Sequence, residues 1–218
     1  LFLLAVPVAV LAASFPLIAL IVAEILLWLL LTLAYNTEPQ LEREGRRGGE
    51  RKNSDSLIRV ATLPWHIVKA LLLSAPRLLL LAIVYLAGIV VTTVLMGLPV
   101  HELSWYFTAD RSIPIPLLDD VPFSMCGLTL AGFMAIGWLI TVFGPQSAMI
   151  RLGAGVLRGI TSTRQEPVTP LPANGSPATP TTERGGRGTA LFTIWIIVTL
   201  ALCALPLLGM PISWTPLA

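Results

Sequence analysis

The sequence predicts an all-α, polytopic membrane protein with four transmembrane helices, and three observations support this prediction. Of the 218 residues, 55% are hydrophobic and 12% are charged, which is about half the charged share of a typical soluble domain. The mean hydropathy is +0.81. The apolar residues form four runs, each long enough to cross the hydrocarbon core of a bilayer, which takes ~20 helical residues. We therefore expect lipid to surround the chain and no soluble domain to be present.

The first run, residues 1–35, predicts one long, kinked transmembrane helix. At 1.5 Å per residue it would measure ~50 Å, which exceeds the ~30 Å hydrocarbon core and requires a tilt or a break. Pro7 and Pro16 are the expected interruptions, because proline removes a backbone donor and clashes with the preceding turn. We expect residues 17–35 to make the main crossing. A re-entrant first half that ends at Pro16 is the alternative.

Residues 36–76 predict a loop followed by a segment that lies along the membrane surface. The loop, residues 36–55, is polar and mixed in charge and contains several glycines, which is typical of a solvated stretch. The following residues are apolar but include Arg59 and Lys69, a composition that favours an interfacial position. The second transmembrane helix is expected over residues 77–98, beginning at Arg77, after a serine and a proline that are typical of a helix start.

Residues 99–121 predict an acidic loop, because they hold four carboxylates against a single arginine. The third transmembrane helix is expected over residues 122–145, ending at a Gly-Pro pair.

Residues 146–188 predict a second interfacial segment followed by a flexible linker. Arg151 and Arg158 lie seven residues apart on one strip of the expected helix, and the linker is rich in threonine, proline and glycine. The fourth transmembrane helix is expected over residues 189–209, and residues 210–218 form a short tail.

The distribution of basic residues predicts the orientation in the cell membrane. Of the 14 lysines and arginines, eight fall between the first and second helices and five between the third and fourth, whereas Arg111 stands alone between the second and third. Loops rich in lysine and arginine remain in the cytoplasm. We therefore expect segments 36–76 and 146–188 to be cytoplasmic, and loop 99–121 and both termini to be external.

Glu24 is the strongest candidate site, because it lies inside the first apolar run, eleven residues before its end. This spacing places it ~16 Å into the membrane at 1.5 Å per residue. A charged carboxylate there costs at least ~2.5 kcal/mol on insertion scales, which favours a protonated side chain. Glu24 is therefore expected to bind a proton or an ion, or to contact a basic group of a partner. The alternative is a structural hydrogen bond between helices.

Two further sets of residues are candidates for contacts. Small residues in the third apolar run allow close approach of helix backbones, either within the chain or against a second protein. The basic residues that flank the apolar runs are expected to contact lipid headgroups. The helix-packing set is Gly127, Ala131, Gly132, Ala135 and Gly137, and the membrane-interface set is Arg59, Lys69, Arg77, Arg151 and Arg158.

The sequence favours a function without catalysis. It contains no phosphate-binding loop and no nucleophile motif, and its histidines and cysteines are not spaced as metal ligands. We therefore expect no enzymatic activity, no cofactor, no metal and no nucleic-acid partner. The favoured interpretation is a structural or regulatory subunit that packs against other membrane-protein subunits in a larger complex. The alternative is a small oligomeric transporter or channel that uses Glu24 as a proton or cation site.

Overall fold

The computed structural model describes residues 1–46, 53–108, 111–145, 147–158 and 185–217. The chain is mostly helical, 79%, and four of its helices are long and apolar enough to cross a membrane, as the sequence predicts. The elements in chain order are α1 (Phe2–Ser14), α2 (Pro16–Arg46), α3 (Asn53–Met96), β1 (Val100–Thr108), β2 (Arg111–Leu118), α4 (Met125–Phe143), α5 (Ala148–Leu157) and α6 (Gly185–Leu207).

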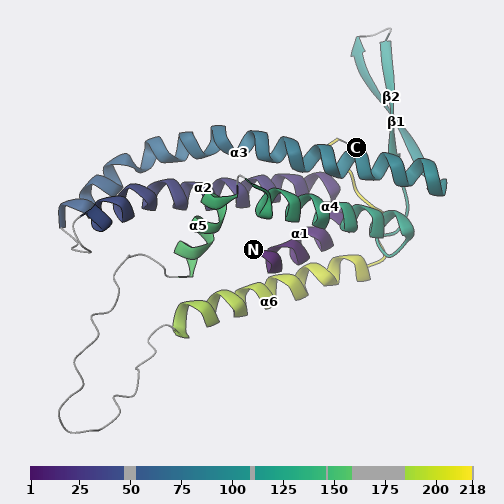
Figure 1. Cartoon of the computed structure of the whole chain (residues 1–218). Coiled ribbons are helices and arrows are strands. Elements are labelled where there is room, and N and C mark those ends of the chain that lie inside the picture. The colour runs from purple at the N-terminus through teal and green to yellow at the C-terminus, as the bar shows by residue number, and fades with distance from the viewer. Residues whose placement is uncertain (47–52, 109–110, 146, 159–184, 218) are drawn as a thin grey trace.

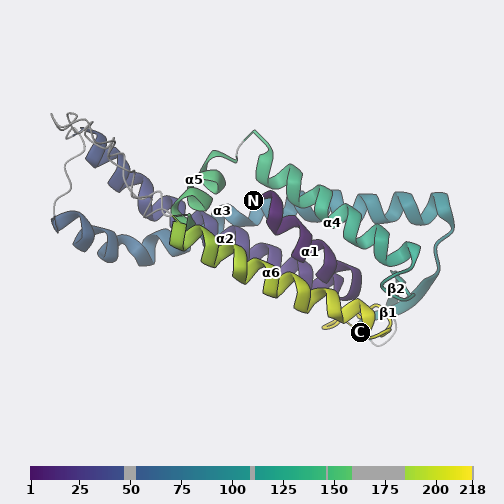
Figure 2. The same cartoon turned by 90° about the horizontal axis from the view of Figure 1, so that it is seen from below.

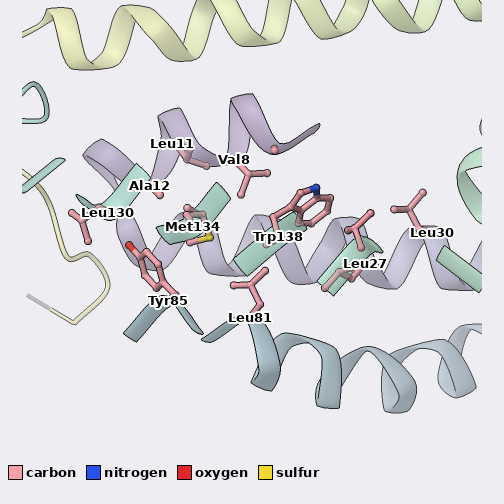
Figure 3. Packing of buried hydrophobic residues seen from close by; sticks show 14 of the residues in the cluster. Val8, Leu11, Ala12, Leu27, Leu30, Leu81, Tyr85, Leu130, Met134 and Trp138 are labelled. Carbon is pink, nitrogen blue, oxygen red and sulfur yellow. The ribbon is translucent and has the colours of Figure 1, made fainter. Parts of the chain in front are cut away.

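The four long helices run along one common direction, and the short helix α1 lies among them (Figure 1). Helix α3 packs on α2 and α4, whereas α1 packs on α4, α6 and α2. The core lies where α1, α2, α3 and α4 meet, and Figure 3 shows its side chains. Its largest fully buried members include Leu27, Leu81, Tyr85, Met134 and Trp138.

Residues 1–35 form two helices and not the single kinked helix of the sequence analysis. Helix α1 ends at Ser14, Phe15 is extended with φ −136° and ψ 77°, and α2 begins at Pro16. The cause is steric, because a residue that precedes proline is disfavoured in the α region. The chain reverses its direction here, so that α1 and α2 lie on either side of a tight turn (Figure 2).

Residues 36–96 also differ from the expected loop, interfacial segment and helix. Helix α2 continues to Arg46, and α3 is unbroken from Asn53 to Met96 although it contains two prolines. Near the second of these, Pro76, the Arg77 guanidinium donates to the Leu73 carbonyl at 2.5 Å. The carbonyl that Pro76 itself leaves without a helical donor is that of Leu72, one residue earlier. The stretch that was predicted to lie on the membrane surface is therefore the first half of a helix that packs against α2.

The expected loop 99–121 contains the antiparallel hairpin of β1 and β2, and the C-terminal tail is tied to its base. The backbone N–H of Ile212 donates to the Asp120 carbonyl, and that of Ser213 donates to the Ser14 carbonyl, both at 2.9 Å. The Trp214 indole donates to the Leu118 carbonyl, also at 2.9 Å. The tail therefore joins the end of α1 to the hairpin at one end of the helix bundle.

Leu1 does not lie near this tail, and the expected external position of both termini stays a prediction. Because the chain reverses at Phe15, Leu1 lies near the opposite end and lines a cavity together with Arg158 and Gly188. Helix α5 forms within the predicted interfacial segment, but it packs against α2. The predicted linker lies almost entirely outside the described residues.

Candidate functional site

The interface between α2 and α3 carries the polar contacts of the candidate site. Glu24, Trp28 and Tyr35 follow one another along α2 at spacings of four and seven residues, which places them on one face of the helix. Each contacts α3: Glu24 through Ser74, Trp28 through its indole N–H to the Ile67 carbonyl at 3.0 Å, and Tyr35 through the Lys69 ammonium, 4.4 Å from the ring centroid. The two antiparallel helices are thus joined by three contacts that involve polar or charged groups.

Glu24 is half-buried, and its two carboxyl oxygens have different environments. Oε1 lies 2.5 Å from the Ser74 hydroxyl, and that hydroxyl also lies 2.8 Å from the Leu71 carbonyl. A serine hydroxyl has a single proton, so it cannot donate to both oxygens. The Ser74 hydroxyl therefore lies between two acceptors, the Glu24 carboxylate on α2 and the Leu71 carbonyl on its own helix.

Oε2 of Glu24 is buried and has no hydrogen-bond partner among the described residues. Arg77 lies one helical turn beyond Ser74 on α3, and its guanidinium donates to the Leu73 carbonyl, as described above. Lys69 lies five residues before Ser74 and contacts the ring of Tyr35. Basic residues therefore lie one to two helical turns along α3 from Ser74, the residue that contacts Glu24. Chemically, the pair of Glu24 and Ser74 can hold a proton or accept a hydrogen bond from one further donor.

Ser74 was missed as a site residue, because the sequence analysis interpreted it as the cap of a helix that begins near Arg77. Ser74 is buried in the middle of α3, fifty residues from Glu24. A single serine beside a proline signals a helix start equally well, so no local pattern could have identified this contact.

The predicted helix-packing residues have different roles in the structure. A Cβ atom added to Gly137 would lie 3.2 Å from the Leu81 carbonyl oxygen, so Gly137 lets α4 approach α3 closely. Gly127 fits against the backbone of Pro122, ahead of α4. Gly132 is exposed, with nothing near its added Cβ, and Ala135 is half-buried. Gly127 and Ala131 both line a cavity between α4 and α6.

Two close helix contacts use glycines that were not predicted. A Cβ on Gly153 would lie 2.0 Å from the Leu30 carbonyl oxygen, so α5 packs directly on the backbone of α2. A Cβ on Gly88 would meet the ring of Phe133, where α3 crosses α4. The sequence analysis overlooked these contacts because an isolated glycine also weakens a helix.

The predicted membrane-interface residues lie in different parts of the structure. Lys69 and Arg77 lie at the interface of α2 and α3, with the contacts given above. Arg151 and Arg158 are exposed on and after α5. Arg59 lies on α3, and its side chain is outside the described part of the chain.

Helix α6 is held less tightly than the other long helices. Among the described elements it packs substantially only on α1. Only 11% of its apolar window is buried, against 22% for α3, 39% for α2 and 44% for α4. Two cavities separate it from the bundle. One of about 300 Å³ lies toward α4 and is lined by Cys203 of α6, and one of about 340 Å³ lies toward α5 and is lined by Trp195.

A hydrogen bond joins α6 to α1: the Trp195 indole donates to the Leu3 carbonyl at 2.7 Å. Pro7 explains why this carbonyl is available, because a proline four residues later cannot supply the helical N–H. The donor therefore comes from another helix, 192 residues away in sequence.

Both cysteines are free thiols, and no group of three or more metal-ligating side chains occurs among the described residues. Comparison of the chain with protein-family models, with curated proteins and with solved structures found no match.

Proposed function

We propose that this chain is a non-catalytic integral membrane subunit, structural or regulatory, of a larger membrane complex that it joins through its helices. The observation that carries this proposal is the loose attachment of α6, which leaves two cavities against its own bundle.

The physical argument rests on how helices associate in lipid. Lipid tails are as apolar as leucine, so helices are held together by close packing and by polar contacts and not by the hydrophobic effect. A helix with cavities along its inner side has unused packing surface. Small residues line the cavity toward α4, namely Gly127, Ala131 and Cys203. Large side chains of a partner helix would fill this space.

Purification in a mild detergent tests the proposal directly. We expect a larger membrane protein to co-purify with the tagged chain in a fixed ratio. Cys203→Leu would fill part of the cavity from within and should lower the recovered partner at least tenfold. Leu200→Ile, on the exposed side of α6, is the matched control and should retain the partner. Purification of the chain without any stoichiometric partner would contradict the proposal.

The second candidate function is a small oligomeric transporter or channel that uses Glu24 as its proton or cation site. The buried and unpartnered Oε2 atom favours it. Glu24→Gln keeps the size of the side chain and removes its titratable proton. If Glu24 carries a proton or cation, this variant should fold and assemble normally but lose flux across liposomes.

Glu24→Gln and Glu24→Ala together distinguish two further roles of Glu24, a contact to a basic group of a partner and a structural hydrogen bond. If the carboxylate pairs with a basic group of a partner, both Glu24→Gln and Glu24→Ala should release that partner, because a buried cation would lose its counter-charge. If it only bonds to Ser74, Gln should be tolerated and Ala should cost on the order of 1 kcal/mol. Normal assembly and flux in both variants would remove Glu24 from the candidate sites.

A further inference from the structure

The hairpin of β1 and β2 stands apart from the helices. Within the described chain its strands form a two-stranded sheet and pair only with each other. Figure 1 shows the hairpin extending across the direction of the helices, on the side of α3 and beyond the body of the bundle. A two-stranded hairpin alone is only marginally stable in water, and further strands or packing normally support it.

The register shows which backbone groups face outward. The Asp119 N–H donates to the Pro99 carbonyl at 3.3 Å, so this pair is a hydrogen-bonded one. In an antiparallel pair, hydrogen-bonded and non-hydrogen-bonded positions alternate. The pairs of Glu102 with Pro116 and of Ser104 with Pro114 follow in this register at the non-hydrogen-bonded positions. Their backbone N–H and C=O groups therefore point away from the ladder.

The outer edge of β2 is closed to a further strand. Two of its outward positions are Pro114 and Pro116, which have no N–H to donate. The next one, Leu118, uses its carbonyl to accept from the Trp214 indole. Prolines and covering segments are the usual means by which proteins prevent strands from adding to a sheet edge.

The outer edge of β1 has none of this protection. Its outward positions include Val100, Glu102 and Ser104, all exposed and all able to donate and to accept. No hydrogen bond reaches their outward backbone groups from the described part of the chain. The hairpin is thus closed along one edge and open along the other.

The occupant that best fits this edge is a second copy of β1. In an antiparallel pair of identical strands, the outward donors of each strand meet the outward acceptors of the other across a twofold axis. That axis is perpendicular to the sheet. Figure 1 shows the strands running across the direction of the helices, so a half-turn about an axis along the helices makes two copies of β1 antiparallel. Two copies inserted in one membrane with the same orientation are related by an axis of this direction.

Helix α3 supports the same arrangement. It lies on the side toward which the hairpin extends (Figure 1), and its outer half exposes a row of large apolar side chains that includes Leu79, Ile83, Leu86, Val90 and Val94. In a pair joined through β1, α3 is the helix of each copy on the side toward which the hairpin extends. We infer that two copies of this chain associate through antiparallel pairing of their β1 strands, which forms a four-stranded sheet in the order β2–β1–β1–β2.

Crosslinking tests this pairing in the native membrane. Ser104→Cys, in a background with Cys126→Ala and Cys203→Ala, places thiols of the two copies at or near the axis. Cα atoms across a hydrogen-bonded antiparallel pair lie ~5.5 Å apart, within the ~4.4–6.8 Å range that a disulfide bridges. We expect a covalent dimer after mild oxidation or treatment with a short bismaleimide. Ser112→Cys, on the far strand β2, should remain monomeric.

A proline scan of the outward positions provides an independent test. Ser104→Pro removes an outward N–H without removing a bond inside the hairpin, as Pro114 already does on the other strand. Energy transfer between two labelled populations in the same vesicles should fall to the level of a non-associating control, and Glu102→Pro should act likewise. Ser104→Ala keeps the N–H and should retain the transfer. Absence of transfer in the unmodified chain would overturn the inference, and so would undiminished transfer in both proline variants.

Discussion

The α2–α3 pair and helix α6 are both apolar helical segments, but they differ in how they are held. Between α2 and α3, three polar contacts accompany a row of fully buried α2 side chains that includes Leu27, Leu31 and Ala34. Helix α6 has one polar tie to α1 and two cavities. Since helices in lipid gain stability from close packing, the difference indicates that the α2–α3 pair stabilises the fold and that α6 is the segment free to adapt.

Matched leucine truncations should give the largest contrast between the two regions. Leu27 of α2 is fully buried, whereas Leu200 of α6 is 65% exposed. Leu27→Ala leaves a cavity in the core and should lower the free energy of unfolding by ~2–5 kcal/mol. Leu200→Ala removes atoms that contact lipid and should change it by less than ~0.5 kcal/mol. Unfolding of the purified chain in mixed micelles measures both, and equal losses would show that α6 is packed as tightly as α2.

Glycine substitutions should give the next largest effect. Gly153→Ala brings a Cβ against the Leu30 carbonyl on α2, where no flexible side chain can yield. We expect a loss of ~1–3 kcal/mol, as for other overpacked sites, and faster proteolysis after α5 as it leaves α2. Gly132→Ala, at an open position of α4, is the control and should be neutral or slightly stabilising. A neutral Gly153→Ala would mean that α5 does not pack on α2.

Tyr85 offers a test in which a substitution should raise the free energy of unfolding, whereas the two preceding tests lower it. Its hydroxyl is buried in the core and has no hydrogen-bond partner among the described residues, and Figure 3 shows the ring among Leu130, Met134 and Leu81. Tyr85→Phe removes the unpaired group and keeps the ring, so the free energy of unfolding should rise by ~1–2 kcal/mol. A loss of stability would reveal a partner for this hydroxyl, such as a buried water.

Composition and apolar run length were enough to predict four membrane helices, because any chain must satisfy its backbone inside lipid. They did not predict which prolines break a helix. Pro16 ends one, but Pro7 and Pro76 lie inside helices. At Pro7 a donor from another helix, the Trp195 indole, serves the freed Leu3 carbonyl. Such partners depend on tertiary contacts that a local pattern does not contain.

The same reasoning applies to the candidate site. Glu24 was identifiable from the sequence because an ionisable residue inside a membrane span is costly. Its contact with Ser74 depends on the register of α2 against α3, which no single segment determines. The open edge of β1 was invisible for a related reason. The sequence shows Pro114 and Pro116, but only the strand register reveals that both face outward.

The smallest expected effect concerns the single polar tie of α6. Trp195→Phe keeps an aromatic ring but removes the donor to the Leu3 carbonyl, and the loss should be about 0.6–1 kcal/mol, as for other interhelical bonds in membranes. Pro7→Ala restores a helical N–H to that same carbonyl. In the Pro7→Ala background, Trp195→Phe should therefore cost almost nothing, and the difference between the two losses is the coupling energy of the cycle. Equal losses in both backgrounds would show that Trp195 holds α6 through ring packing alone, and the contrast with the α2–α3 pair would then rest only on the cavities.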